Sequence, residues 1–301
     1  MYTKSITPDL LRGSVIAVPP LARGCDSEIV ESENRALVRH IEAGGVSTLL
    51  YGGNANLYHC RISEYESILE MLERIVAENT WVIPSVGPPF GMCMDQARIL
   101  AKTDFPTAML LPMQGATTSA GVAEGVRRFV DAFGKPAVVY LKQDGYLDPE
   151  TLARLFDDGY VSFLKYAVVR ENPKVDPYLK AIVEVVDPQR IVSGIGEQPA
   201  IDHMRIFGLA GFTAGCVCLT PGKTQSMLKW IQAGDFDAAN AIREAYVEME
   251  TLRNAINPIR VLHEAVTLSG IADMGPHLPF LSELSEAERQ QVAQAAKRLM
   301  G

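Results

Sequence analysis

The chain contains 301 residues, of which 48% are hydrophobic and 21% are charged, and its 28 basic and 36 acidic side chains give a formal net charge of −8. This composition is typical of a soluble globular protein, and the length fits either two domains or one α/β barrel of about 250 residues. Binding to nucleic acid or to an anionic membrane requires a concentrated basic surface. No such run of basic residues is present, so we expect neither partner.

The sequence predicts neither a secretion signal nor a membrane span. The apolar residues 15–20 are not followed by a small-residue cleavage site, and the uncharged run at residues 206–222 is short and interrupted by glycine and proline. An odd number of cysteines in apolar surroundings is typical of buried free thiols in a reducing compartment, which predicts a cytoplasmic protein. These cysteines are Cys25, Cys60, Cys93, Cys216 and Cys218.

Eight short apolar segments predict strands, and each is followed by a segment with helical periodicity. Their hydrophobicity is continuous rather than alternating, as in parallel strands that helices cover on one face and packed side chains cover on the other. The strands are expected at residues 14–18, 46–51, 81–86, 107–111, 137–140, 161–165, 190–193 and 211–216. Helices are expected to begin near Ser27, Ser63, Gly91, Ser119, Asp148, Pro173, Pro199 and Pro221, with Ser63 and Glu66 forming a capping box.

Eight consecutive strand–helix units predict a (β/α)₈ TIM barrel, because doubly wound sheets more often have five or six strands. The chain then changes character, since residues 235–301 carry no strand signal. Helices are expected there on the stripe Phe236, Ala239, Ile242, Tyr246, Met249 and Leu252, at residues 258–268, and at residues 285–300 with a capping box of Ser285 and Glu288. The sequence therefore predicts a barrel over residues 1–233 and a helical extension, packed on the barrel, over residues 234–301.

Lys165 is the first candidate catalytic residue, because functional groups of such barrels lie at the carboxyl ends of the strands. It ends the sixth predicted strand, where a two-residue period places it on one face with Val161 and Phe163. Partial loss of hydration there would lower the pKa of the ammonium group and leave free amine, which can form a Schiff base with a ketone. The alternative is a lysine that extends from the strand end into solvent.

Two further features lie at neighbouring strand ends. Tyr140 ends the fifth predicted strand, about 4.8 Å from the sixth, and could move protons for a substrate attached to Lys165; the alternative is a core tyrosine with a satisfied hydroxyl. The turn Tyr-Gly-Gly-Asn-Ala-Asn at residues 51–56 would leave backbone N–H groups accessible to a carboxylate. A tight turn without a ligand would have the same composition.

The order and spacing of these motifs resemble the dihydrodipicolinate synthase / N-acetylneuraminate lyase family of class I aldolases and dehydratases. The motifs lie at residues 13–20, 52–56, 138–140, 165, 194–197 and 211–215. The resemblance implies that Lys165 is the Schiff-base lysine and Tyr140 the proton relay, and that Gly53 and Asn54 hold the carboxylate of a pyruvate-like substrate. It also makes Gly194 and Thr213 substrate-binding candidates and implies a homotetramer or dimer that needs no cofactor.

The chain departs from the family pattern at several positions. Asn54 stands where the family has a threonine that hydrogen-bonds the relay tyrosine, and Asn56 replaces a glutamate. Residues 111–114 read Leu-Pro-Met-Gln and lack the tyrosine of the synthase, whereas Lys142 is the cation nearest to the position of an arginine that binds the second substrate. The Gly-Gly turn and the cation two residues after Tyr140 look more like the sugar-acid dehydratase branch, such as 5-dehydro-4-deoxyglucarate dehydratase.

The predicted function is that of a lyase, in which Lys165 forms a Schiff base with a pyruvate-like 2-oxo acid for aldol condensation, aldol cleavage or dehydration. Sugar-acid dehydration is one alternative, and a non-catalytic protein that binds a 2-oxo acid or sugar acid is another. Residues near the distal part of the substrate would select the reaction. The candidates for that role are Gln114, Lys142, Asn56, Tyr58, His59 and Glu197.

A metal-dependent aldolase is a rival interpretation, but it requires several ligands that converge on one ion. The five histidines show no ligand spacing, and Cys216 and Cys218 are expected to alternate across the eighth strand as packing residues. We therefore expect no metal site. Phosphate-loop and dinucleotide motifs also fail, because Val217 and Pro199 stand where the required glycines would be.

Overall fold

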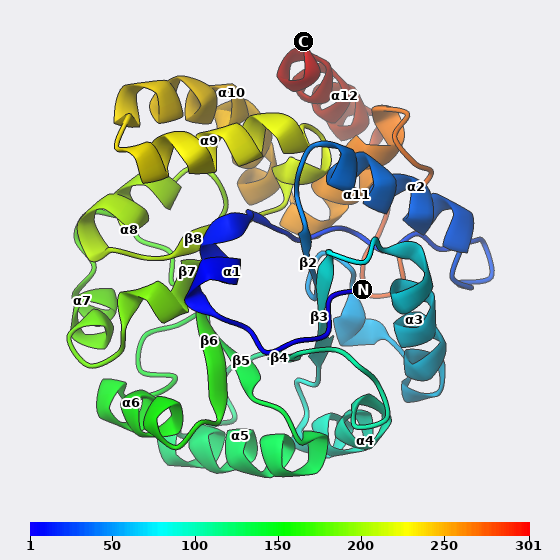
Figure 1. Ribbon diagram of the computed structural model, residues 1–301. Helices are drawn as coiled ribbons and strands as arrows, with labels where there is room; N and C mark the ends of the chain where they lie inside the picture. Colours follow the sequence, from blue (N-terminus) through cyan, green and yellow to red (C-terminus); the bar gives the residue numbers. More distant parts are fainter.

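Eight parallel strands close into a barrel in the computed structural model, which describes residues 1–301 (Figure 1). Each strand pairs with its neighbours in sequence, and β1 pairs with β8 to complete the ring. The predicted (β/α)₈ architecture is confirmed. The strands are β1 (Ile16–Ala17), β2 (Thr48–Tyr51), β3 (Trp81–Val86), β4 (Met109–Leu110), β5 (Ala137–Leu141), β6 (Val161–Tyr166), β7 (Ile191–Ser193) and β8 (Gly211–Ala214).

One crossover helix follows each strand and lies on the outside of the barrel (Figure 1). These helices are α2 (Glu31–Ala43), α3 (Ile62–Ile75), α4 (Phe90–Leu100), α5 (Ser119–Phe133), α6 (Pro149–Asp157), α7 (Pro177–Val183), α8 (Ala200–Phe207) and α9 (Pro221–Ala233). All eight begin within four residues of the positions expected from the sequence. Short 3₁₀ turns are η1 (Leu57–His59), η2 (Pro188–Arg190) and η3 (Cys216–Cys218).

Two local predictions were wrong. Helix α3 begins at Ile62, so Ser63 lies inside the helix, and Glu64 rather than Glu66 accepts a hydrogen bond from the backbone N–H of Arg61 at 2.9 Å. Strand β8 ends at Ala214, and residues 216–218 form the turn η3 instead of continuing the strand. The physical reason is that the chain must bend here to enter α9, although both cysteines of the turn are buried packing residues as expected.

The cysteine prediction was wrong for one residue. All five thiols are free, and four are buried, but Cys25 is exposed in the segment between β1 and α2. Its neighbours in sequence include charged Arg23 and Asp26, so the local surroundings were less apolar than the count of cysteines indicated.

A β-bulge changes which residues of β6 face the barrel interior. Ala137 pairs with Val161 but Val138 pairs with Phe163, so β6 contains one extra residue at this point. Phe163 consequently packs inside the barrel, whereas Val161 packs with the helices outside. The expectation that Val161 shares a face with Lys165 was therefore wrong, although Phe163 and Lys165 keep the two-residue alternation.

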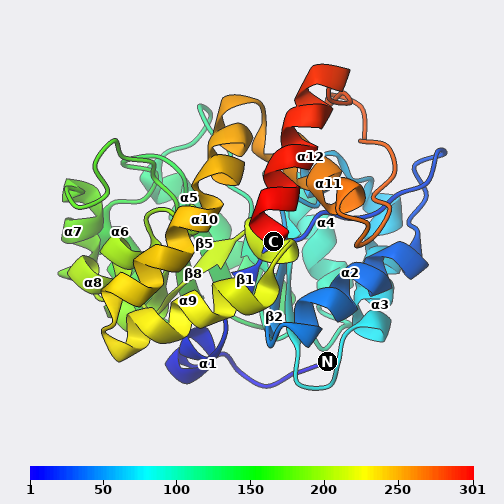
Figure 2. The ribbon, with the colours of Figure 1, turned by 90° about the horizontal axis from the view of Figure 1, so that it is seen from above.

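The two ends of the barrel are covered differently. The helix α1 (Pro8–Gly13), which the sequence did not predict, lies at the amino end, where the backbone of Leu11 approaches the start of β8 at Gly211. Three helices follow the barrel: α10 (Phe236–Ala255), α11 (Pro258–Leu268) and α12 (Glu286–Met300). Figure 2 shows α11 and α12 on the side opposite α1. The predicted helices and the capping box of Ser285 and Glu288 are confirmed here.

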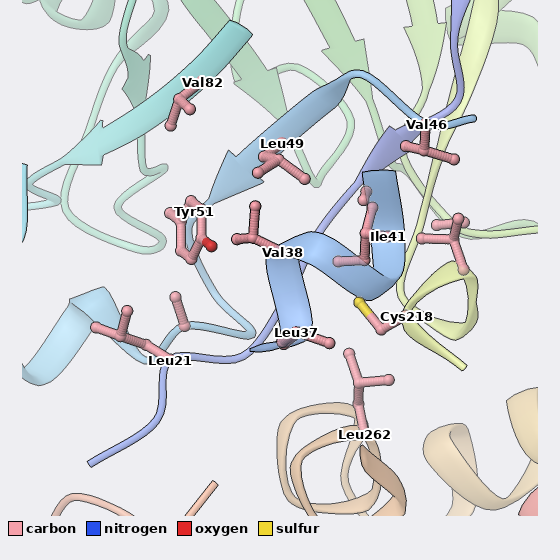
Figure 3. Close-up of a cluster of buried hydrophobic side chains, with 14 of the residues drawn as sticks. Leu21, Leu37, Val38, Ile41, Val46, Leu49, Tyr51, Val82, Cys218 and Leu262 are labelled. Atoms are coloured by element: carbon pink, nitrogen blue, oxygen red, sulfur yellow. The ribbon is translucent and has the colours of Figure 1, made fainter. Parts of the chain in front are cut away.

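The C-terminal helices share a continuous hydrophobic core with the barrel. In Figure 3, Val38 and Ile41 of α2 lie between the barrel residues Leu49 and Tyr51 and the α11 residue Leu262. Burial of large aliphatic side chains stabilises a fold by about 1.5–3 kcal/mol each. The extension is thus held by the same kind of packing as the barrel. No helix in the structure has the length and apolar character that crossing a membrane requires.

Candidate active site

A cavity of about 230 Å³ opens at the carboxyl ends of the strands. Its walls come from the turn after β2, from β5, β6 and β8, from the loop after β7, and from α10 and α11. The polar residues that line it are Asn54, Tyr58, Tyr140, Lys142, Lys165, Thr213, Glu250, Arg253 and Asn254, with Gly53 and Gly194 among the glycines. All six residues that the sequence singled out for catalysis or substrate binding therefore line one cavity.

Lys165 points into this cavity rather than into bulk water. The residue is 4% exposed, and its Nζ donates a hydrogen bond to the backbone carbonyl of Gly194 at 3.3 Å. Burial, with smaller contributions from the charges of Lys142 and Arg253, lowers the pKa of the Lys165 ammonium group to about 7. A substantial fraction of the side chain is therefore neutral amine near physiological pH.

Tyr140 and Lys165 are direct neighbours across the β5–β6 pair. Their Cα atoms are register partners, and the lysine Nζ lies 3.7 Å from the centroid of the tyrosine ring. Burial, together with the nearby phenol of Tyr58, raises the pKa of the Tyr140 hydroxyl. The hydroxyl is thus kept protonated, on a residue whose ring contacts the Lys165 amine.

The turn after β2 presents free backbone donors to the cavity. The N–H groups of Gly53 and Asn54 donate to no acceptor of the protein, and both residues line the cavity. The Asn54 side chain instead donates from Nδ2 to the backbone carbonyl of Val18 at 2.8 Å, which fixes the turn against β1. Adjacent free N–H groups of this kind suit a carboxylate.

Gly194 and Thr213 also line the cavity. A β-carbon at position 194 would lie 2.9 Å from the Ala167 β-carbon and 3.0 Å from Cγ of Lys165, so a glycine is needed for the lysine to pack here. Thr213 is a buried residue of β8, in register with Ile16 of β1.

Only two of the six residues expected to recognise the distal part of the substrate line the cavity. Lys142 and Tyr58 line the cavity, and Lys142 Nζ lies 5.9 Å from the centroid of the Tyr140 ring. The remaining four lie elsewhere. Gln114 is exposed beyond β4, His59 packs against Phe280, and Asn56 and Glu197 are buried outside the cavity lining.

Helix α10 contributes two charged residues that the sequence analysis missed. Glu250 and Arg253 are 3% and 9% exposed, and both line the cavity. A signal for them was present, because Tyr246, Glu250 and Arg253 follow one another at i, i+4 and i+7 and so continue the apolar stripe of this helix. Charged residues on a buried stripe indicate either a buried ion pair or a site.

Behind Arg253, Glu197 and Glu250 form a buried pair of acidic side chains. Backbone N–H groups of Glu197 and Gln198 donate to the Glu250 carboxylate at 3.1 and 3.0 Å. Burial, followed by the charge of Glu250, raises the pKa of Glu197 well above its usual value. Together with Cys216 these groups have the spacing of metal ligands, within 4.8 Å of one another. The adjacent Arg253 guanidinium and the two N–H donors already compensate the negative charge, so we assign no metal to this cluster.

The model of the Dihydrodipicolinate synthetase family matches residues 18–299 of the chain. The chain belongs to this family. Its similarity to solved structures extends along nearly the whole fold, although a search of curated proteins found no significant match. Dihydrodipicolinate synthase from Oceanobacillus iheyensis superposes with a TM-score of 0.84 at 20% identity, covering 96% of this chain and 98% of that chain.

Two other solved structures show the same likeness. Dihydrodipicolinate synthase from Bacillus clausii has a TM-score of 0.82 at 22% identity, covering 96% of this chain and 98% of that chain. N-acetylneuraminate lyase from Fusobacterium nucleatum has a TM-score of 0.83 at 13% identity, covering 97% and 100%. Membership of the dihydrodipicolinate synthetase family identifies the chain as an enzyme of the lyase class, which confirms that prediction over the non-catalytic alternative.

Proposed function

We propose that this dihydrodipicolinate synthetase family member is a class I lyase that forms a Schiff base between Lys165 and the 2-oxo group of a pyruvate-like acid. One observation carries the proposal: the Lys165 amine is buried in the cavity, and its pKa is lowered to about 7. A neutral amine attacks a ketone, and loss of water from the adduct leaves an iminium. The iminium accepts the electron pair released when a C3–H or C3–C4 bond breaks.

Tyr140 is the proposed proton relay for these steps. Its phenol borders the amine across the β5–β6 pair, and its raised pKa keeps it protonated until a base forms at the substrate. It can donate a proton to the hydroxyl that departs during iminium formation and recover it later. The free N–H groups of Gly53 and Asn54 would hold the substrate carboxylate, with Gly194 and Thr213 flanking the reacting carbons.

The branch taken after the iminium depends on the distal part of the substrate. An enamine can attack an aldehyde to form an aldol bond, or a hydroxyl can leave from the carbon next to C3 with a proton from the relay. Sugar-acid dehydration is the alternative that Lys142 supports, because this cation lines the cavity beside Tyr140. Assays of 2-oxo acid release from deoxy sugar acids and of aldol products from pyruvate and aldehydes would separate the branches.

Trapping with sodium cyanoborohydride tests the proposal directly. We expect a reduced pyruvyl adduct on the peptide that contains Lys165 when the protein is incubated with pyruvate and the reductant. The matched controls are K165M, which should give no adduct, and K180M, which removes a lysine of α7 and should behave like the wild type. Absence of an adduct, or an adduct on other lysines only, would contradict the proposed function.

We further propose a homo-oligomer, a tetramer or a dimer, in the cytoplasm. The family resemblance supports the assembly, and closed symmetric oligomers are common among enzymes. Five free cysteines support a reducing compartment. Light scattering of the purified protein measures the assembly, and a mass equal to that of one chain would contradict it.

A further inference from the structure

Arg253 stands out among the residues of the cavity because its charge is buried and no carboxylate oxygen lies within 4.0 Å of it, although the acidic pair of Glu197 and Glu250 is near. The side chain is 9% exposed and lines the cavity, and Nε donates to the backbone carbonyl of Pro258 at 3.2 Å. None of the ion pairs within 4.0 Å includes Arg253, and its two Nη nitrogens donate to no oxygen of the protein. Burying a guanidinium in this way is unfavourable unless a ligand completes its hydrogen bonds.

The fold makes room for this guanidinium at the barrel mouth. A β-carbon at Gly215, just beyond β8, would lie 2.7–2.8 Å from the Arg253 guanidinium atoms, so a glycine permits the close approach. The neighbouring Glu250 carboxylate is occupied by two backbone N–H groups. The Cys216 thiol is a polar neighbour of the guanidinium, but no oxygen of the protein accepts from its Nη nitrogens, which can therefore bind a carboxylate of a ligand in the cavity.

The charges around the cavity favour an anion with more than one acidic group. Lys142 and Arg253 contribute cationic side chains, Lys165 is partly protonated near pH 7, and Glu250 is the acidic side chain among the lining residues. The free N–H groups of Gly53 and Asn54 can bind one carboxylate, whereas Arg253 lies on a different wall, between the ends of β7 and β8 and helix α10.

We propose that Arg253 binds a second carboxylate at the far end of the substrate, so that the enzyme acts on 2-oxo dicarboxylic acids. The inference rests on the proposed function, since it assumes that the 2-oxo end of the same molecule lies at Lys165. A charge-assisted hydrogen bond in a buried site contributes about 1.5–3 kcal/mol, equivalent to a factor of roughly 10–100 in affinity.

Matched acids test the assignment. In each of two pairs, one acid carries a carboxylate at the far end and the other carries a methyl group there. The pairs are 2-oxoglutarate with 2-oxopentanoate, and 2-oxoadipate with 2-oxohexanoate. Titration calorimetry of the wild-type protein should show that at least one dicarboxylate binds about 10–100-fold more tightly than its partner. The variant R253M should reduce that ratio to near one, and R253K should retain part of it because the charge remains without the fork.

R243M is the control, because it removes one half-buried arginine from the same helix, outside the lining of this cavity. It should keep the wild-type ratio. Equal binding of both members of each pair by the wild type, or a preference that R253M retains, would overturn the assignment. Should R253M fail to fold, R253K gives the comparison, because it should lower the ratio and an unchanged ratio would overturn the assignment.

The two proposals fail in different ways. Failure to trap an adduct on Lys165 with any 2-oxo acid overturns the Schiff-base function, because trapping detects the covalent bond directly. The dicarboxylate preference is an equilibrium measurement that needs no adduct, so its absence overturns the role of Arg253 even when pyruvate is trapped normally.

Discussion

Gly196 leaves the space that the Glu250 carboxylate occupies. A β-carbon at position 196 would overlap Oε1 of Glu250, and the backbone φ of Gly196 is +112°. The loop after β7 therefore adopts a left-handed conformation that favours glycine, and helix α10 brings its acidic side chain directly against it. This contact connects the barrel mouth to the C-terminal extension.

G196A should disrupt that connection. The overlap and the strain at positive φ together predict a loss of about 2–4 kcal/mol in the free energy of unfolding, measured by denaturant titration. G134A is the matched control, because Gly134 also has positive φ but nothing lies within 4 Å of its β-carbon position. It should lose about 1 kcal/mol. Equal losses in the two variants would show that the Glu250 contact contributes nothing.

The rate of Schiff-base formation should depend on pH through the Lys165 amine. Because burial lowers the pKa to about 7, the rate of pyruvate trapping should rise between pH 6 and 8 and then level off. A lysine with an ordinary pKa near 10.4 would give a rate that still rises above pH 9. K142M removes one of the charges that lower this pKa, so the midpoint should move to higher pH. A midpoint near 10 in the wild type would contradict the buried amine.

The same shift predicts that Lys165 destabilises the folded protein. Its pKa falls from 10.5 in the unfolded chain to about 7 in the folded one, so the unfolded state binds more protons between these values and stability rises with pH across this window. K165M should therefore be more stable than the wild type by about 3–5 kcal/mol at pH 6, and the gain should narrow to about 2 kcal/mol at pH 9. Thermal unfolding across this range measures it. A pH-independent gain would indicate improved packing only.

The sequence was sufficient to predict the barrel and the position of its central lysine. Both rest on local patterns: the continuous hydrophobicity of parallel strands, and a charged residue at the point where such a run ends. Lys165 and Tyr140 lie on adjacent strands at the same level, so their proximity follows from the topology. Detection of this pair required only the order of the strands and the two-residue period near their ends.

The contribution of the extension could not be derived in this way. Arg253 reaches the cavity because the C-terminal end of α10 lies at the barrel mouth, and the orientation of this helix depends on packing between distant segments rather than on periodicity. The bulge in β6 places the Val161 side chain outside the barrel instead of inside. It likewise depends on the pairing with β5. Asn56 and Glu197 were selected by proximity to motifs, but neither lines the cavity.

The buried pair of Glu197 and Glu250 makes an opposite pH prediction. The raised pKa of Glu197 means that the folded protein retains a proton that the unfolded chain loses above about pH 4.5, so this group lowers stability as pH rises from that value toward its folded pKa. E197Q resembles the protonated acid. It should match the wild type near pH 4 and be more stable by about 1–3 kcal/mol at pH 7, measured by denaturant titration.

E250Q tests whether the proton is held mainly on Glu197, because it replaces the other carboxyl group of the pair with a neutral amide. Both Glu250 oxygens accept backbone N–H groups, so an amide nitrogen at one of these positions would face a donor. We therefore expect E250Q to be less stable than the wild type by about 1–3 kcal/mol at pH 7, the opposite sign to E197Q. Changes of the same sign in both variants would mean that the proton is not held mainly on Glu197. The backbone donors would then not decide which acid is ionised.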